Sequence, residues 1–456
     1  MRRVLVAAAF AGVAFAHLLS LPHALVEADT YLHMAVGRLV AQGTIPRADP
    51  FTFTTGGAPW VAHEWLSGWA FHVLHGFGGM GFLVWAVTAA GVLAVVLAGL
   101  ASEGSATGQL VAGAVALLLI GSTYCVRPHV LALVWLAGTA RAVRAFVRSG
   151  RRRNLAVAVL LVWLWANTHG SFVLAGAVFA AGFLELAREA QPHRRARDLA
   201  AAAALALVAC CSNPYGPALL VLPFRFVENR ALLQTIAEWR APTWAECPWQ
   251  MGLTGLVLAV VAARWRRMSA GDALLVLVAY LLWASARRNV VLVGVLAAPV
   301  LGRVLPGAGN PLRFVECMVG TALALALAFP FTVLREVQHP FQFSRACAFA
   351  IKTAPGQGRV FNDGELGGYL IWELGPEHPV FVDWRAELFR DSPVIAQYNQ
   401  VLEGAAGWDS VLSFYRVEWV FVQRGRAVVR LLEGHPGWIE VCGDPAHVLF
   451  RRRHAI

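Results

Sequence analysis

The sequence predicts a mainly α-helical, multi-pass membrane bundle of about eleven spans, followed by a C-terminal soluble α/β domain. Three observations predict this fold class. Hydrophobic residues make up 58% of the chain and charged residues only 14%, whereas soluble domains have about 45–50% and about 25%. Apolar runs alternate with short arginine-rich loops through the first two-thirds of the chain. From about residue 340 the apolar stretches shorten to the length of strands.

The chain begins with Met-Arg-Arg and an apolar run over residues 1–20. This segment fits an uncleaved first span, and it also fits a secretory signal peptide with small residues at Ala14 and Ala16. In both cases the long loop over residues 21–80 faces outside. Within this loop, the residue pattern predicts a short interfacial helix over 34–41 and another helical stretch over 64–75.

The remaining spans follow from further apolar runs, several of which are short enough to need burial in a bundle. They lie at residues 81–99, 109–124, 129–147, 154–166, 171–186, 199–212, 251–264, 272–285, 290–305 and 313–333. The arginine-richest loops, at 141–153, 188–197 and 264–267, fall on the inner side if the N-terminus is inside. The sequence therefore predicts that the 21–80 loop and the C-terminus face outside.

The expected domain boundary separates a membrane module over residues 1–338 from an extracytoplasmic α/β domain over residues 339–456. The pattern predicts strands at 359–362, 379–383, 418–423 and 438–442, and helices at 364–373, 392–403 and 424–433. The seven cysteines show no zinc-type spacing. Cys347 and Cys442 can pair only if this region is extracytoplasmic, and the sequence does not show that they are close together.

The 21–80 loop holds most of the groups suited to acid–base chemistry. They are Glu27, Asp29, His33, Asp49, His63 and Glu64. Ionisable residues beside a membrane mark a candidate functional site. Asp29 is the first candidate for a general base that takes the proton of an acceptor hydroxyl as its oxygen attacks a sugar carbon. Glu64 and Asp49 are further catalytic candidates, and the alternative for Asp29 is a helix cap.

The alternative role for these acids is to bind a divalent cation, because carboxylate ligands suit Mg²⁺ or Mn²⁺. Its ligands would be Asp29, Asp49 and Glu64. The spacing does not demand a metal, and acids in a loop are usually solvated. The sequence therefore names no cofactor.

Polar groups also interrupt the apolar runs at the predicted outer ends of the spans. Together with Glu27, His33 and His63, they give the candidate substrate-binding residues Arg127, His129, Asn167, His169, Glu238, Arg240, Arg287 and Arg288. Arginine binds phosphate oxygens bidentately, which suits a lipid phosphate. The alternative for each arginine is snorkelling to the membrane surface, and for Asn167 and His169 it is helix capping.

Several motifs together resemble a large group of bacterial multi-pass, glycosyltransferase-like proteins of the GT-C superfamily. In the first loop these are Asp29-x-x-x-His33, Gly37-Arg38, Gly43-x-Ile45-Pro46-x-x-Asp49-Pro50-Phe51 and His63-Glu64-Trp65-Leu66. Further along they are Arg127-Pro128-His129, Asn167-x-His169-Gly170, Asn213-Pro214-Tyr215-Gly216, Glu238-Trp239, Arg288-Asn289, Asn362-Asp363, Gly367-Gly368-Tyr369-Leu370 and Asp383-x-Arg385. The resemblance covers nearly the whole chain.

The resemblance implies a GT-C fold in the bacterial cytoplasmic (inner) membrane, with Asp29 at the position of the acidic loop residue. It also implies an inverting glycosyltransferase that moves a sugar from a polyprenyl-phosphate donor to an extracytoplasmic glycan, lipid or protein. Thr30-Tyr31-Leu32 stands where related sequences often carry tryptophan, which bears on the identity of the donor. The alternatives are a lipid-linked sugar transporter or flippase and a non-catalytic scaffold of envelope polysaccharide assembly. No nucleic-acid partner is expected.

Overall fold

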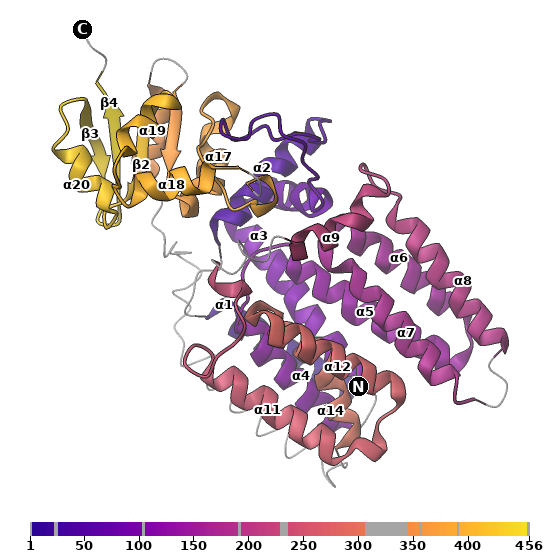
Figure 1. Ribbon diagram of the computed structural model, residues 1–456. Helices are drawn as coiled ribbons and strands as arrows, with labels where there is room; N and C mark the ends of the chain where they lie inside the picture. The colour runs from indigo at the N-terminus through magenta and orange to yellow at the C-terminus, as the bar shows by residue number, and fades with distance from the viewer. Residues whose placement is uncertain are drawn as a thin grey trace. The chain divides into compact units, whose positions relative to one another are not determined.

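The computed structural model describes residues 2–21, 26–102, 105–189, 193–228, 236–305, 344–354, 358–389 and 392–453. Its contacts divide the chain into two compact units. The helical unit comprises Met1–Leu25 and Gly78–Val337, and the sheet unit comprises Val26–Phe77 and Gln338–Ile456. Figure 1 shows the elements of both units, and each unit is described by itself below.

The helical unit is built from apolar helices, as the run of apolar segments predicts. They are α1 (Arg2–Leu19), the later part of α3 (Trp65–Ala101), α4 (Ala106–Gly121), α5 (His129–Ser149), α6 (Arg152–Thr168), α7 (Ala175–Leu186), α8 (His193–Cys210), α9 (Ala218–Glu228), α11 (Pro248–Ala263), α12 (Ala270–Ser285), α13 (Val290–Leu292) and α14 (Ala298–Val304). Helix α6 packs between α5 and α8, α7 packs against α12, and α4 packs against α14 (Figure 1).

A buried charge cluster links three of these helices. Asp272, in the first turn of α12, accepts hydrogen bonds from Arg144 of α5 and Arg303 of α14. The side chain of Asp272 is only 5% exposed. Because a buried carboxylate is costly unless it is paired, these contacts fix how the three helices pack together.

The number of spans stays a prediction. In the part of the chain that the structure describes, Trp65–Ala101 and His129–Ser149 are long and apolar enough to cross a membrane, and the other apolar helices are shorter. The predicted span at 313–333 lies outside the described residues. Exposed apolar side chains such as Leu205 and Val208 on α8 and Leu281 on α12 form the kind of surface that a lipid-facing helix presents.

Helix α3 is broken at two glycines. Gly78 and Gly79 have non-helical backbone angles, and Gly79 has a φ of 68°, which glycine adopts without a steric penalty. The stretch before this break belongs to the sheet unit and the stretch after it to the helical unit. The predicted helix over 64–75 is therefore confirmed as a separate helical stretch.

The sheet unit contains a four-stranded sheet in the order β1-β2-β4-β3. Its strands are β1 (Arg359–Asn362), β2 (Val417–Gln423), β3 (Trp438–Gly443) and β4 (His447–Arg452). Strands β1 and β2 are parallel, and the other two pairs are antiparallel. Its helices are α2 (Ala28–Ala41), α16 (Arg345–Thr353), α17 (Gly367–Leu374), α18 (Val394–Leu402), α19 (Trp408–Phe414) and α20 (Ala427–Glu433).

The predicted elements of this unit are largely confirmed. The strands expected at 359–362, 418–423 and 438–442 are β1, β2 and β3, and the three expected helices correspond to α17, α18 and α20. The strand expected at 379–383 is wrong, because only Val380 forms isolated bridges there. Strand β4 was not expected. The helix predicted at 34–41 is the later part of α2, which begins earlier, at Ala28.

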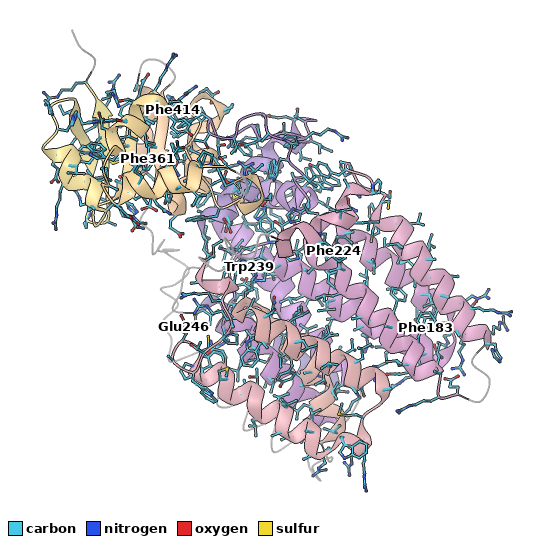
Figure 2. All side chains as sticks on the ribbon, viewed as in Figure 1. Phe183, Phe224, Trp239, Glu246, Phe361 and Phe414 are labelled. Atoms are coloured by element: carbon cyan, nitrogen blue, oxygen red, sulfur yellow. A yellow bond between two sulfur atoms is a disulfide. The ribbon has the colours of Figure 1, made fainter. Side chains whose placement is uncertain are left out.

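The first loop and the C-terminal region form one unit because their backbones pair. The amide of Phe53 donates to the carbonyl of Val380 at 3.2 Å, and the amide of Val380 donates to the carbonyl of Phe51 at 3.1 Å. Val380 also bridges to Val360 of β1, and β1 places the fully buried Phe361 in the core (Figure 2). The structure therefore groups Val26–Phe77 with the C-terminal region, whereas the boundary expected from the sequence assigns this loop to the membrane module.

One covalent link ties the two ends of the C-terminal region together. Cys347 of α16 and Cys442 of β3 form a disulfide across 95 residues. The other cysteines in the described part of the chain, Cys125, Cys210, Cys211 and Cys247, are free thiols.

Candidate active site

Asp29 lies in the first turn of α2, not at its cap. Glu27 is the N-cap residue, and its backbone amide donates to the hydroxyl of Thr30 at 3.2 Å. Asp29 is therefore inside the helix and half-buried. Its carboxylate thus lies in the first turn of the helix, where the backbone amides carry partial positive charge.

Glu64 lies between two histidines. Its Oε2 atom is 3.3 Å from Nε2 of His33, and its Oε1 atom is 3.8 Å from Nε2 of His63. His33 follows Asp29 by four residues, so the two share one face of α2. The structure thus brings three of the predicted loop residues together on the sheet unit, one helical turn from Asp29.

Asp49 has a different environment from the other predicted acids. Its side chain is fully buried, and it accepts hydrogen bonds from Arg385 at 2.7 Å, from the Phe51 amide at 3.0 Å and from the Thr52 and Thr55 hydroxyls. Burial alone raises the pKa of a carboxyl, but Arg385 and these hydrogen bonds outweigh it, and the pKa of Asp49 lies below its ordinary value. All of its oxygens are engaged within the protein, so we do not retain Asp49 as a candidate base.

The predicted metal ligands do not come together. Asp49 is held by Arg385, away from the group formed by Glu64 and its histidines. Among the residues that the structure describes, no three His, Cys, Asp or Glu side chains are arranged to hold a metal ion. We therefore derive no step through a metal, and metal dependence stays a prediction.

Two of the predicted phosphate ligands, Arg127 and Arg288, meet at a cavity of the helical unit. The cavity has a volume of about 210 Å³, which exceeds the space of several water molecules. Its polar residues include Arg127, His129, His169, Ser171, Glu238, Arg288 and Asn289, and its other walls include Leu133, Leu136, Trp165, Val173, Leu282 and Val291. We call this space the arginine cavity. It combines a basic group with an apolar wall, as a lipid phosphate requires.

Glu238 joins the two arginines of this cavity. It lies in the short helical turn Ala237–Trp239. Its Oε1 atom accepts a hydrogen bond from Arg288 at 2.8 Å, and both of its oxygens lie 3.4 Å from Nη1 of Arg127. Burial by itself raises the pKa of the Glu238 carboxyl. The positive charges of Arg288 and Arg127 lower it by more than burial raises it, so the pKa lies below its ordinary value and Glu238 is ionised at neutral pH.

The remaining predicted binding residues do not line the arginine cavity. Arg240 and Arg287 both lie near Glu246, at 3.5 and 3.4 Å. The side-chain amide of Asn167 donates to the carbonyl of Trp163, four residues earlier within α6, at 2.9 Å, so this bond is not a helix cap. Figure 2 labels Trp239 and Glu246, which lie at separate points of the loop before α11.

The candidate binding residues chosen from the sequence did not include three contributors to the arginine cavity. Ser171 and Asn289 line the arginine cavity, and the indole of Trp239 lies 4.6 Å below the guanidinium of Arg288. Trp239 and Asn289 directly follow two predicted residues, so proximity in sequence was a usable signal for them. Nothing in the sequence paired Asp49 with Arg385, which is 336 residues away.

Comparison with known proteins gives structural neighbours only. No family model matches the sequence, and no curated protein matches it. The fold is similar to that of an oligosaccharyltransferase from Archaeoglobus fulgidus in the apo form, with a TM-score of 0.59 and 13% identity over 92% of this chain and 69% of that chain. It is equally similar to ArnT from Cupriavidus metallidurans in the apo state, with a TM-score of 0.58 and 15% identity over 98% of this chain and 97% of that chain.

A structure of the archaeal oligosaccharyltransferase AglB from Archaeoglobus fulgidus also matches. It was solved with an inhibitory peptide and a dolichol-phosphate, and it matches with a TM-score of 0.55 and 12% identity over 92% of this chain and 70% of that chain. These neighbours are glycosyltransferases of the GT-C superfamily. The chain therefore has the GT-C fold that the sequence motifs predicted.

Proposed function

We propose, from the GT-C fold of this chain, that it is an inverting glycosyltransferase that moves a sugar from a polyprenyl-phosphate donor to an acceptor outside the cytoplasmic membrane. The observation that carries the proposal is the arginine cavity. Arg127 and Arg288 provide guanidinium groups for a phosphate, and the leucine and valine side chains beside them suit the start of a lipid chain. The dolichol-phosphate complex of the archaeal neighbour supports a lipid phosphate as ligand.

The proposed reaction needs one base. The carboxylate of Asp29 takes the proton of the acceptor hydroxyl while the oxygen forms a bond to the anomeric carbon of the sugar. The bond between that carbon and the phosphate oxygen breaks, and the electron pair leaves with the lipid phosphate. A lipid phosphate is a stable anion, so it needs no proton from a general acid. Attack from the face opposite the phosphate inverts the anomeric centre.

His33, His63 and Glu64 act in this proposal as positioning residues. The Glu64 carboxylate holds both histidines near Asp29 on α2. We place the protein in the bacterial inner membrane with the N-terminus inside and the sheet unit outside. The distribution of arginines supports this orientation, and so does the disulfide, because disulfides persist in oxidising compartments.

The test is sugar transfer in proteoliposomes that contain the full chain and a panel of radiolabelled polyprenyl-phosphate sugars, with a membrane extract as acceptor. Wild type should transfer label from at least one donor, and Asp29→Asn should lose at least about a hundredfold in rate, the usual size of a general-base effect. Asp198→Asn is the matched control, since Asp198 pairs with Arg152 on the surface.

Three results would contradict the proposal. Full activity in Asp29→Asn would remove Asp29 as the base. Passage of labelled lipid across the membrane without covalent transfer would indicate a transporter or flippase, and the absence of both activities in folded protein would leave a scaffold.

A further inference from the structure

The carboxylate of Glu238 occupies the part of the arginine cavity where an anion would bind. It touches both guanidinium groups, at 2.8 Å from Arg288 and 3.4 Å from Arg127. Its side chain is 38% exposed, whereas the arginines are 24% and 20% exposed. Glu238 can therefore turn towards solvent more easily than either arginine.

The charges in this cavity do not cancel. Two arginines and one glutamate leave a net charge of +1. A sugar donor of the proposed type is a phosphodiester with one negative charge. Once the sugar has left, the lipid phosphate is a monoester with a charge of about −1.5 to −2 at neutral pH, because its second pKa is about 6. The cavity therefore meets a ligand whose negative charge grows during the reaction.

Glu238 acts on the two ligands unequally. The energy of its repulsion from a bound anion is proportional to the charge of that anion. The same carboxylate consequently destabilises the bound monoester product about twice as strongly as the bound diester donor. Without Glu238 the two arginines would carry a net charge of +2, and their preference for the product over the donor would be larger.

We propose that Glu238 is a product-release residue, whose negative charge beside Arg127 and Arg288 repels the monoester product more strongly than the diester donor and so reduces the preference of the cavity for its product. This inference rests on the proposed function. Trp239 supports it, because the stacking of its indole on Arg288 at 4.6 Å holds that guanidinium in place when an anion binds beside Glu238.

The opposite role would be purely structural. If Glu238 only orients the arginines, its removal would loosen them and weaken the binding of every anion. If Glu238 repels the bound anion, removal of its negative charge instead strengthens anion binding, and does so more for the anion of higher charge. The sign and the charge dependence of the effect therefore separate the two roles.

The experiment measures two dissociation constants for the purified full chain in detergent at pH 8. Farnesyl phosphate is the monoester probe and farnesyl methyl phosphate is the diester probe, and binding is followed by titration calorimetry. The variants are Glu238→Gln, which removes the charge, and Glu238→Asp, which keeps it. Glu246→Gln is the matched control, because Glu246 pairs with Arg240 and Arg287 outside the cavity.

Glu238→Gln should bind the monoester at least about tenfold more tightly than wild type does, and the gain for the diester should be clearly smaller. Glu238→Asp and Glu246→Gln should keep the wild-type ratio of the two constants. Arg288→Gln should weaken the binding of both probes, and this result would show that they bind in the arginine cavity. The histidines of the cavity are common to all variants and do not alter the comparison.

The inference would be overturned if a folded Glu238→Gln variant bound both probes only as tightly as wild type does, or less tightly. If that variant unfolds, retention of the wild-type ratio in Glu238→Ser would overturn it as well. Failure of wild type to bind either probe would instead overturn the proposed function. In the transfer assay, Glu238→Gln should show stronger inhibition by added farnesyl phosphate than wild type does.

Discussion

At the scale of single residues, Arg385 makes buried contacts with both parts of the sheet unit. Its side chain is 5% exposed and pairs with Asp49 at 2.7 Å and Asp383 at 2.6 Å. Its guanidinium also lies 4.4 Å from the ring of Trp60. Asp49 and Trp60 come from the first loop, so this one cation binds that loop to the C-terminal region.

Breaking this pair should destabilise the sheet unit strongly. We expect Asp49→Ala to cost about 3–5 kcal/mol, since it leaves a buried guanidinium short of one carboxylate. Glu440→Ala is the control within the same unit, because its pair with Arg424 is exposed and such pairs contribute about 0–1 kcal/mol. Hydrogen exchange of β1 and β2 in the full chain measures both effects, and equal protection in the two variants would contradict the prediction.

The same pair should make the stability of the sheet unit depend on pH. The folded pKa of Asp49 is lowered from its ordinary value of 3.8, so the unfolded chain binds the proton first as the pH falls. The stabilisation is therefore present above about pH 5 and is lost as the pH drops through 3.8 towards the lowered value. The thermal midpoint should fall more steeply between pH 6 and pH 3 in wild type than in Asp49→Asn. If the midpoints of the two proteins fall in parallel, Asp49 does not contribute to the pH dependence of stability.

At the scale of elements, α2 is placed by contacts that only glycine permits. A Cβ atom on Gly37 would lie 2.0 Å from the carbonyl oxygen of Gly68 in α3. A Cβ atom on Gly368 of α17 would lie 2.0 Å from the carbonyl oxygen of Ala28. Both neighbours are backbone atoms, so they cannot rotate away. The helix that carries Asp29 and His33 is thus held closely on two sides.

Adding one methyl group at Gly37 should therefore displace α2. We expect Gly37→Ala to lower the thermal midpoint, at a cost of at least about 1–3 kcal/mol, and to reduce sugar transfer because Asp29 moves with the helix. Gly76→Ala is the matched control in α3, since its Cβ would have no neighbour within 4 Å and alanine favours a helix by about 1 kcal/mol. Equal effects of the two substitutions would show that the packing of α2 does not matter.

At the scale of the whole molecule, the disulfide reports on the compartment of the sheet unit. Cys347 and Cys442 are 95 residues apart and bonded. In a bacterium the bond requires export of this region, since the cytoplasm keeps thiols reduced. The free cysteines in the described helical unit provide an internal reference.

Thiol labelling of the denatured protein, taken directly from cells, should reveal this bond. Without reductant, a maleimide that adds mass should label the free thiols but not Cys347 or Cys442. Reduction should then add two labels, which appear as a further gel shift. The double variant Cys347→Ser/Cys442→Ser should lack that shift, and labelling of both cysteines without reductant would place the sheet unit in the cytoplasm.

The amino-acid sequence by itself determined the class of the fold, because apolar periodicity and composition act locally along the chain. It predicted the apolar helices, most elements of the C-terminal sheet and the residues around the arginine cavity. Those residues could be found because each one interrupts an apolar run, where a charge is costly and needs a reason. The motifs predicted the GT-C fold, which the similarity to the solved structures confirms.

Only the tertiary structure decided how distant segments combine. Pairing of Phe51 and Phe53 with Val380, and of Asp49 with Arg385, joins residues more than three hundred positions apart, and no local pattern encodes such a partner. The same holds for Glu238, which the sequence indicated as one of several substrate-binding candidates and the structure places between two arginines. A single sequence states which groups are charged, but the free energy of a charge depends on what surrounds it, and folding alone determines those surroundings.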